Sequence, residues 1–165
     1  MPEGEELVIN TGPLIALTAA LGDLTVLREL YARVTVPFAV CQEIEATNAS
    51  RFAAAEFQVA GWLDKQTSPQ RVSAFLRNAL DPGEAAVIQL ALSDAIETVC
   101  IDETVGRRVA RLHGLKITGS LGILLRAKRE GLISELRPAV ERMRSHGIRL
   151  GNGLIAAVLR HAGEL

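Results

Sequence analysis

Long apolar runs and aromatic residues are scarce in this sequence of 165 residues. No apolar run approaches the roughly 18 to 20 residues that a membrane helix needs, and the acidic residues 1–6 lack the basic region of a secretory signal. Aromatic residues make up 4% of the chain, so stacking on flat ligands is a minor contribution to any binding. We therefore expect a cytoplasmic protein without a membrane partner.

Cysteine is also scarce, because the chain contains only Cys41 and Cys100. The two lie far apart and have no further ligand at the spacing of a metal site. A disulfide framework or a zinc site is therefore not indicated. We expect both thiols to be reduced and to pack as small core residues.

The charges are unevenly distributed, although the formal net charge is only -1. Residues 1–103 contain 6 basic and 15 acidic side chains, whereas residues 104–165 contain 12 and 4. This asymmetry is typical of a protein that binds a polyanion or a metal, but two oppositely charged faces that neutralise each other explain it equally well. Hydrophobic residues make up 48% of the chain, which is enough for the core of a single domain over residues 1–165.

Short β-branched runs alternate with Ala- and Leu-rich segments along the chain. The expected strands cover residues 7–9, 33–36, 62–66, 98–101 and 115–118. The expected helices cover residues 14–21, 37–46, 50–60, a segment ending near 80, 85–92, 104–113, 119–129, 135–145 and 153–161. This alternation predicts an α/β fold with three layers, α/β/α, and a mostly parallel central sheet.

Oxygen-bearing side chains follow the expected strands at the point where each strand ends. Right-handed crossovers bring the carboxyl ends of parallel strands to one edge of the sheet, and ligands of open α/β sheets bind at that edge. Carboxylates that converge there repel one another unless a cation joins them, and Mg²⁺ prefers such oxygen ligands. The candidates at the strand ends are Asn10, Thr11, Glu43, Asp102, Glu103, Gly119 and Ser120, and Glu84 joins them if its helix begins at the same edge.

Each candidate also has a structural explanation. Asp81 and Glu84 form a capping box at the start of a helix, and Asp102 is placed to cap the helix that follows it. Asn10 is typical of an Asx-turn, and Glu43 taken alone passes for a surface residue. Their common location at one edge of the sheet favours a functional site, because unrelated caps have no reason to gather there.

Several of these segments together resemble the PIN-domain ribonucleases, in the same order and at similar spacing. The matching segments are residues 8–15, 36–44, 81–85, 101–103 and 106–110. Residues 119–128 and 131–133 are similar to the later pattern of a small prokaryotic PIN-like group. The resemblance covers nearly the whole chain.

The resemblance implies Mg²⁺- or Mn²⁺-dependent cleavage of RNA. It also implies that the protein is the toxin of a type II toxin-antitoxin module, with a small antitoxin protein as partner and a homodimer as its assembly. At matching positions, the acidic ligands of the family fall on Asn10, Glu43, Glu84 and Asp102. The first of these is usually aspartate, and an amide brings no negative charge, so metal affinity and water activation should both weaken.

Basic and hydroxyl side chains near the same edge are candidate contacts with the substrate. Thr11 and Ser120 are placed to bind a metal-bound water or a phosphate. Arg107, Arg108 and Arg126 are candidate contacts with an RNA backbone, although solvated helix faces explain these arginines equally well.

Two other functions remain open. A PIN-like module that has lost turnover through Asn10 would bind RNA or a protein partner without cleaving it. A Rossmann-like or P-loop nucleotide binder needs a glycine-rich phosphate turn after the first strand, and residues 10–13 supply only one glycine.

Overall fold

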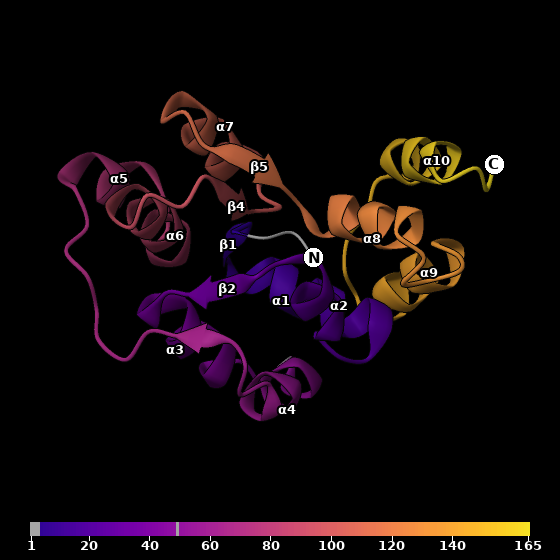
Figure 1. Cartoon of the computed structure of the whole chain (residues 1–165), viewed down its shortest axis with the longest axis horizontal. Helices are drawn as coiled ribbons and strands as arrows, with labels where there is room; N and C mark the ends of the chain where they lie inside the picture. Colours follow the sequence, from indigo (N-terminus) through magenta and orange to yellow (C-terminus); the bar gives the residue numbers. More distant parts are fainter. Residues whose placement is uncertain (1–3, 49) are drawn as a thin grey trace.

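The computed structural model describes residues 4–48 and 50–165, and its helices and strands alternate along the chain (Figure 1). The strands are β1 (Glu6–Ile9), β2 (Arg33–Val36), β3 (Asp64–Lys65), β4 (Thr98–Cys100) and β5 (Lys116–Thr118). The helices are α1 (Thr11–Leu21), α2 (Thr25–Leu30), α3 (Phe38–Ala46), α4 (Arg51–Val59), α5 (Ala74–Ala79), α6 (Pro82–Ser93), α7 (Thr104–Leu112), α8 (Ser120–Arg129), α9 (Arg137–Ser145) and α10 (Asn152–His161).

The five strands form one parallel sheet in the order β3-β2-β1-β4-β5. In the central strand β1, Leu7, Val8 and Ile9 are fully buried, and Leu7 pairs with Val34 of β2 and with Thr98 of β4. The chain moves outward from β1 to β2 and β3, and then returns to add β4 and β5 on the other side. The direction of winding therefore reverses between β1 and β4, which is where open parallel sheets leave a crevice for ligands.

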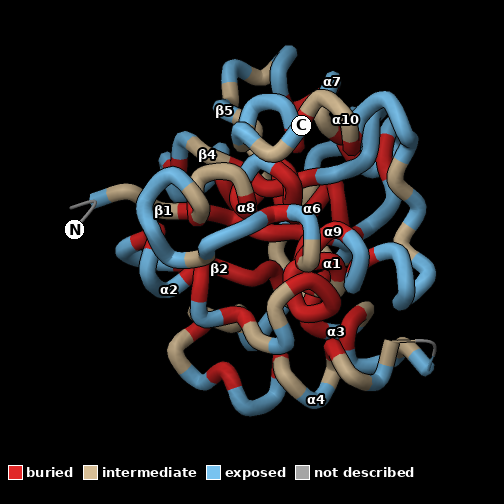
Figure 2. The backbone as a smooth tube through the Cα atoms, turned by 90° about the vertical axis from the view of Figure 1, so that its right-hand side faces the viewer, coloured by how far each residue is buried: buried red, intermediate tan, exposed pale blue. Residues whose placement is uncertain are grey.

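Helices cover both faces of the sheet, which confirms the predicted α/β/α architecture (Figure 1). Helix α1 packs against α3, α4, α8 and α9, whereas α6 packs against α3, α5, α7, β1 and β4. Figure 2 shows the buried backbone concentrated in the centre, where α1 passes beside the strands. Both cysteines are buried and free, as predicted from their isolation in the sequence.

Several elements differ from the prediction. Helix α1 begins at Thr11 and is therefore three residues longer than the predicted 14–21. Helix α2 was not expected, because its six residues are too few to be stable alone; Val26, Leu27 and Leu30 are buried against the rest of the fold. The third strand is shorter than the predicted 62–66, because only Asp64 and Lys65 pair with β2 at the edge of the sheet.

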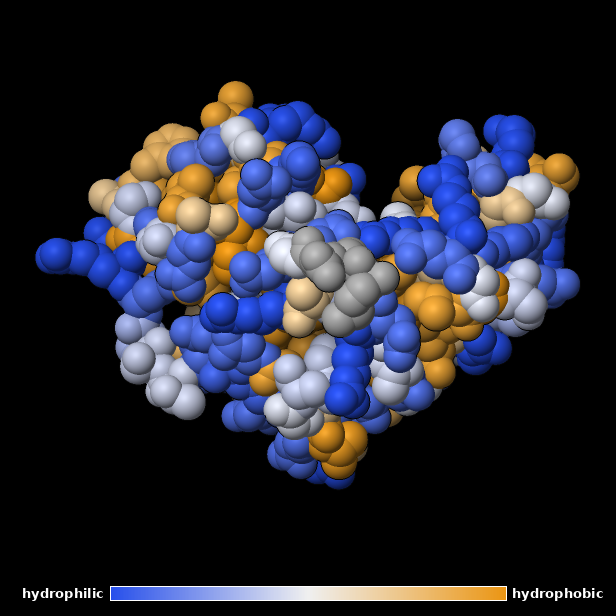
Figure 3. All heavy atoms as spheres, in the orientation of Figure 1, coloured by the Kyte–Doolittle hydropathy of each residue, from blue (hydrophilic) through white to orange (hydrophobic). Residues whose placement is uncertain are grey.

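The surface is mainly polar. Figure 3 shows polar side chains with scattered apolar patches on one face, which is hollowed between the part that contains α7 and β5 and the part that contains α10. Among residues 4–48 and 50–165, no helix combines the length and the apolar character needed to cross a membrane.

Candidate functional site

Asn10 lies directly after β1, at the point where the winding of the sheet reverses. Its backbone N–H donates to the carbonyl of Cys100 at the end of β4, with an N···O distance of 3.1 Å. Asn10 is only 7% exposed and is the residue before α1, but its side chain makes no capping bond. Its Oδ1 has no hydrogen-bond partner, and a buried polar atom without a partner costs about 1–3 kcal/mol. The Asx-turn alternative is therefore not what the structure contains, and the oxygen is available to a ligand.

Glu43 projects from α3 and is held between two other helices. The hydroxyl of Thr11, the first residue of α1, donates to Glu43 Oε2 at 2.8 Å. On the α6 side, Gly83 lies so close that a Cβ built on it would be 3.0 Å from Glu43 Cδ. Thr11 therefore orients the carboxylate, and the missing side chain of Gly83 leaves room for it.

Glu84 lies in the first turn of α6 and is only 6% exposed. The capping function belongs to Asp81, whose Oδ1 accepts the Glu84 backbone N–H at 2.9 Å. Glu84 Oε2 has no hydrogen-bond partner and lies against Gly106 of α7. Burial, together with the nearby carboxylates of Asp81 and Glu103, raises the pKa of Glu84 to about 7. The buried carboxyl group is therefore shared between its protonated and ionised forms near neutral pH.

Asp102 follows β4 and is held by the start of α8. The backbone N–H of Ser120 donates to Asp102 Oδ1 at 2.8 Å, and the Ser120 hydroxyl donates to Oδ2 at 2.9 Å. The carboxylate thus occupies the positive end of the α8 dipole, so this helix start holds Asp102. The N-cap residue of α7 is Glu103, so Asp102 does not cap that helix.

Arg107 lies beside Asp102. Its Nη1 donates to the carbonyl of Ile101 at 2.8 Å. A Cβ built on Gly119 would lie 2.7 Å from Asp102 Oδ1 and 2.8 Å from Arg107 Nη1, so both groups pack against this glycine. The guanidinium therefore adds a positive charge next to Asp102.

These side chains form a continuous neighbourhood along the carboxyl edge of the sheet. Gly83 touches Glu43, Glu84 follows Gly83, and Gly106 touches both Glu84 and Ile101, the residue before Asp102. Within the described part of the chain, however, no three His, Cys, Asp or Glu side chains are gathered closely enough to hold a metal ion. An ion that joined three of these carboxylates would require at least one of them to change rotamer.

The donor chemistry nevertheless fits a hard divalent cation. Carboxylate and amide oxygens are the ligands that Mg²⁺ and Mn²⁺ prefer. Two of these oxygens, Asn10 Oδ1 and Glu84 Oε2, are buried without partners. A cation bound beside either oxygen would give that oxygen a partner.

The other two arginines named from the sequence lie elsewhere. Arg108 is exposed on α7. Arg126 forms a two-pronged pair with Glu5, with N···O distances of 3.0 Å, next to the start of β1. Helix α8 begins at the carboxyl edge, and its length carries Arg126 to the opposite edge. The structure therefore does not bring Arg126 together with the carboxylates of the candidate site.

The sequence did not predict that three glycines touch the acidic side chains: Gly83, Gly106 and Gly119. Each stands within four residues of an expected ligand or of Ser120, but this spacing alone does not reveal a contact. A close approach between helices depends on tertiary packing, which a single sequence does not show.

One comparison with known proteins gave a match. A family model described as a PIN domain matches residues 6–164, a range that includes Asn10, Glu43, Glu84 and Asp102. No curated protein and no solved structure matches the chain.

Proposed function

The chain belongs to the PIN-domain family, which has a nuclease-type fold, and from this premise we propose that it is an endoribonuclease dependent on Mg²⁺ or Mn²⁺. One observation carries the proposal: two buried oxygens, Asn10 Oδ1 and Glu84 Oε2, have no partners. Asn10 precedes Thr11, which donates to Glu43, and Glu84 lies between Gly83 and Gly106, which contact Glu43 and the residue before Asp102. Carboxylate and amide oxygens from separate elements, at the reversal point of a parallel sheet, are suitable ligands for a cation that promotes phosphodiester hydrolysis.

The proposed roles follow from the contacts. Glu43, Glu84 and Asp102, with Asn10, would hold the cation, which when bound supplies an activated water and neutralises charge on the phosphate. Thr11 orients Glu43, and Ser120 orients Asp102. Arg107 lies beside Asp102, where its guanidinium would attract a phosphate oxygen.

We further propose that the protein is the toxin of a type II toxin-antitoxin module. In this role it would act in the cytoplasm as a homodimer and bind a small antitoxin protein. Its PIN-domain family supports this proposal. Expression of the protein alone should slow the growth of a bacterial host, and co-expression with a small protein encoded by a neighbouring gene should give a complex and restore growth. Analytical ultracentrifugation of the protein alone should give twice the chain mass.

Asn10 favours a second function. An amide in place of a carboxylate weakens both metal binding and water activation, so a PIN-like module that binds RNA or a protein without cleavage is the alternative. In that case the protein would bind its partner with little dependence on the metal.

Incubation of the purified protein with RNA and Mn²⁺, beside an Asp102→Asn variant, separates the two functions. Cleavage by the natural protein and its loss in the variant would support the ribonuclease. Equal cleavage by both proteins would indicate a contaminating nuclease and leave the proposal without support. RNA binding without cleavage by either protein would support the second function.

A further inference from the structure

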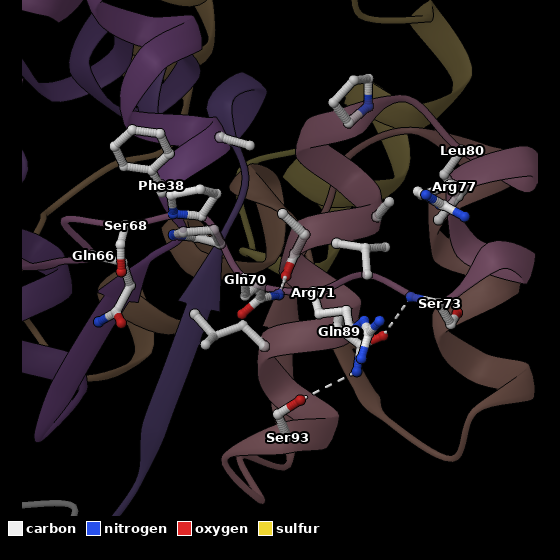
Figure 4. A pocket seen from close by; sticks show the side chains of 18 of the residues that line it. Phe38, Gln66, Ser68, Gln70, Arg71, Ser73, Arg77, Leu80, Gln89 and Ser93 are labelled. Carbon is white, nitrogen blue, oxygen red and sulfur yellow. Dashed lines mark hydrogen bonds between the residues drawn. The ribbon is translucent and has the colours of Figure 1, made fainter.

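A large cavity lies beside α6, on the side that faces α3 and α5 (Figure 4). Its volume is about 1280 Å³, and its walls are the start of α3, the segment 66–73 between β3 and α5, and one face of α6. Pockets for small molecules usually measure about 300–1,000 Å³, so this cavity has room for part of a polymer chain.

The wall of the cavity is fixed in place by hydrogen bonds. Gln70 Nε2 donates to the carbonyl of Ala86 at 2.8 Å, and the backbone N–H of Ser73 donates to Gln89 Oε1 at 3.0 Å. Gln89 in turn donates to the hydroxyl of Ser93 at 3.1 Å (Figure 4). Because the segment 66–73 is already ordered, a ligand would not have to supply the free energy for ordering it.

The charged lining of the cavity is mainly positive. Arg71 and Arg77 both line it and are exposed, and Asp94 is the acidic residue of the lining. Neither arginine makes an ion pair or a side-chain hydrogen bond with residues 4–48 or 50–165. Two guanidinium groups without partners favour an anionic ligand, and their planar geometry suits phosphate.

The uncharged lining suits a nucleobase. Gln66 and Ser68 present an amide and a hydroxyl at one end of the cavity, near the half-buried ring of Phe38. Single-stranded RNA is recognised by hydrogen bonds to the edges of its bases and by stacking on aromatic rings or on guanidinium planes. On the α6 wall of the cavity, the small side chains of Ala85 and Ala86 leave room for a flat base.

The cavity borders the candidate active site. Pro82 lines it, and the next residue, Gly83, touches Glu43. Phe38 belongs to the same helix as Glu43. From this position and lining we infer that the cavity binds the nucleotides of a single-stranded RNA that flank the cleaved phosphodiester bond. The inference rests on the proposed function, which places that bond at the carboxylates.

The test is an RNA-binding measurement on the full chain. Fluorescence anisotropy with a labelled single-stranded oligoribonucleotide, in EDTA to prevent cleavage, would compare the natural protein with the double variant Arg71→Ala/Arg77→Ala. We expect binding to weaken by about tenfold or more, because two charge-assisted contacts are lost. The slope of log K against log salt should fall by about 2.

The matched control is Arg28→Ala/Arg160→Ala, which removes the same charge from exposed positions on α2 and α10. The control should change affinity and salt slope much less than the cavity variant. Equal affinity in the two double variants would overturn the inference, and so would the absence of RNA binding by the natural protein. Hydrogen exchange in which polyglutamate, but not RNA, protects residues 66–80 would assign the cavity to an acidic protein partner and also overturn it.

A small substrate distinguishes failure of this inference from failure of the proposed function. Bis(p-nitrophenyl) phosphate has no neighbouring nucleotides, so with Mn²⁺ its hydrolysis should be lost in Asp102→Asn but kept in Arg71→Ala/Arg77→Ala. Loss in both variants would contradict a separate role for the cavity. No hydrolysis by the natural protein would count against the proposed function, and the anisotropy measurement would still decide whether RNA binds in the cavity.

Discussion

Gly83 and the carboxylate of Glu43 are in direct contact across the junction of α6 and α3, with Glu43 Cδ 3.0 Å from the position that a Cβ on Gly83 would take. The atoms in the way are the far end of a flexible side chain, so the fold can accommodate a methyl group there. The carboxylate of Glu43, however, would have to move away from the added methyl group.

We predict that Gly83→Ala lowers the affinity for Mn²⁺ by about 10- to 100-fold, the usual effect of disturbing a residue that supports a metal ligand. The temperature of unfolding should change little, because alanine is favoured over glycine within a helix. Isothermal calorimetry and thermal unfolding give the two readouts.

Gly153→Ala is the matched control, because Gly153 is also the second residue of a helix and an added Cβ meets nothing within 4 Å. It should leave Mn²⁺ affinity unchanged. A loss of affinity in both variants, or in neither, would contradict the role assigned to Gly83.

Asn10→Asp should raise Mn²⁺ affinity, because it supplies the negative charge that the amide lacks. Without metal it should lower the free energy of unfolding at neutral pH, since a carboxylate would be buried at a position that is 7% exposed. Asn78→Asp, at an exposed position on α5, adds the same charge as a control. Unchanged affinity in calorimetry would mean that Asn10 is not a ligand.

Glu84 should make the metal-free protein less stable as the pH rises. Its pKa is raised to about 7 in the folded protein, above the ordinary value of 4.5, so the folded state favours the protonated form. The free energy of unfolding in EDTA should therefore fall between about pH 4.5 and pH 7. Glu84→Gln should flatten this part of the profile in urea titrations and also abolish Mn²⁺ binding.

At Glu164 the dependence of stability on pH has the opposite sign. This carboxylate accepts hydrogen bonds from Lys128 Nζ at 2.8 Å and from the backbone N–H groups of Leu136 and Arg137. Burial alone would raise its pKa, but these donors outweigh burial and lower the pKa to about 2. Its contribution to stability is therefore complete above about pH 4.5 and is lost as the pH falls towards 2.

Glu164→Gln should lower the free energy of unfolding at pH 7 by about 1–3 kcal/mol. The difference from the natural protein should shrink in acid, as measured by urea unfolding between pH 2.5 and 7. Glu141→Gln, at an exposed position on α9, should have a much smaller effect. If the difference in the free energy of unfolding between the natural protein and Glu164→Gln did not change with pH, the charge of Glu164 would not contribute to stability.

The sheet was predictable because residues 7–9, 33–36 and 98–101 are mainly apolar or β-branched runs that end at polar residues or proline. The parallel order then followed from the helices between them. Helix α2 was not predictable, because its stability comes from packing rather than from helix propensity.

The location of the candidate site was also predicted from the strand ends, but the contacts of its members were not. Arg126 pairs with Glu5, which is 121 residues away in the sequence, and Ser120 directs both of its donors to Asp102. Such long-range pairings depend on how α8 lies against the sheet, and a single sequence contains no record of that packing.

The strand order has a consequence for synthesis of the protein. Asn10 and Glu43 belong to the part of the chain that leaves the ribosome first, but β4 must insert beside β1 before Asp102 can join them. Ser120, which holds Asp102, emerges later still. A nascent chain that ends before α8 therefore lacks this support, so a protein able to cut RNA would reach its working form only after α8 had left the ribosome.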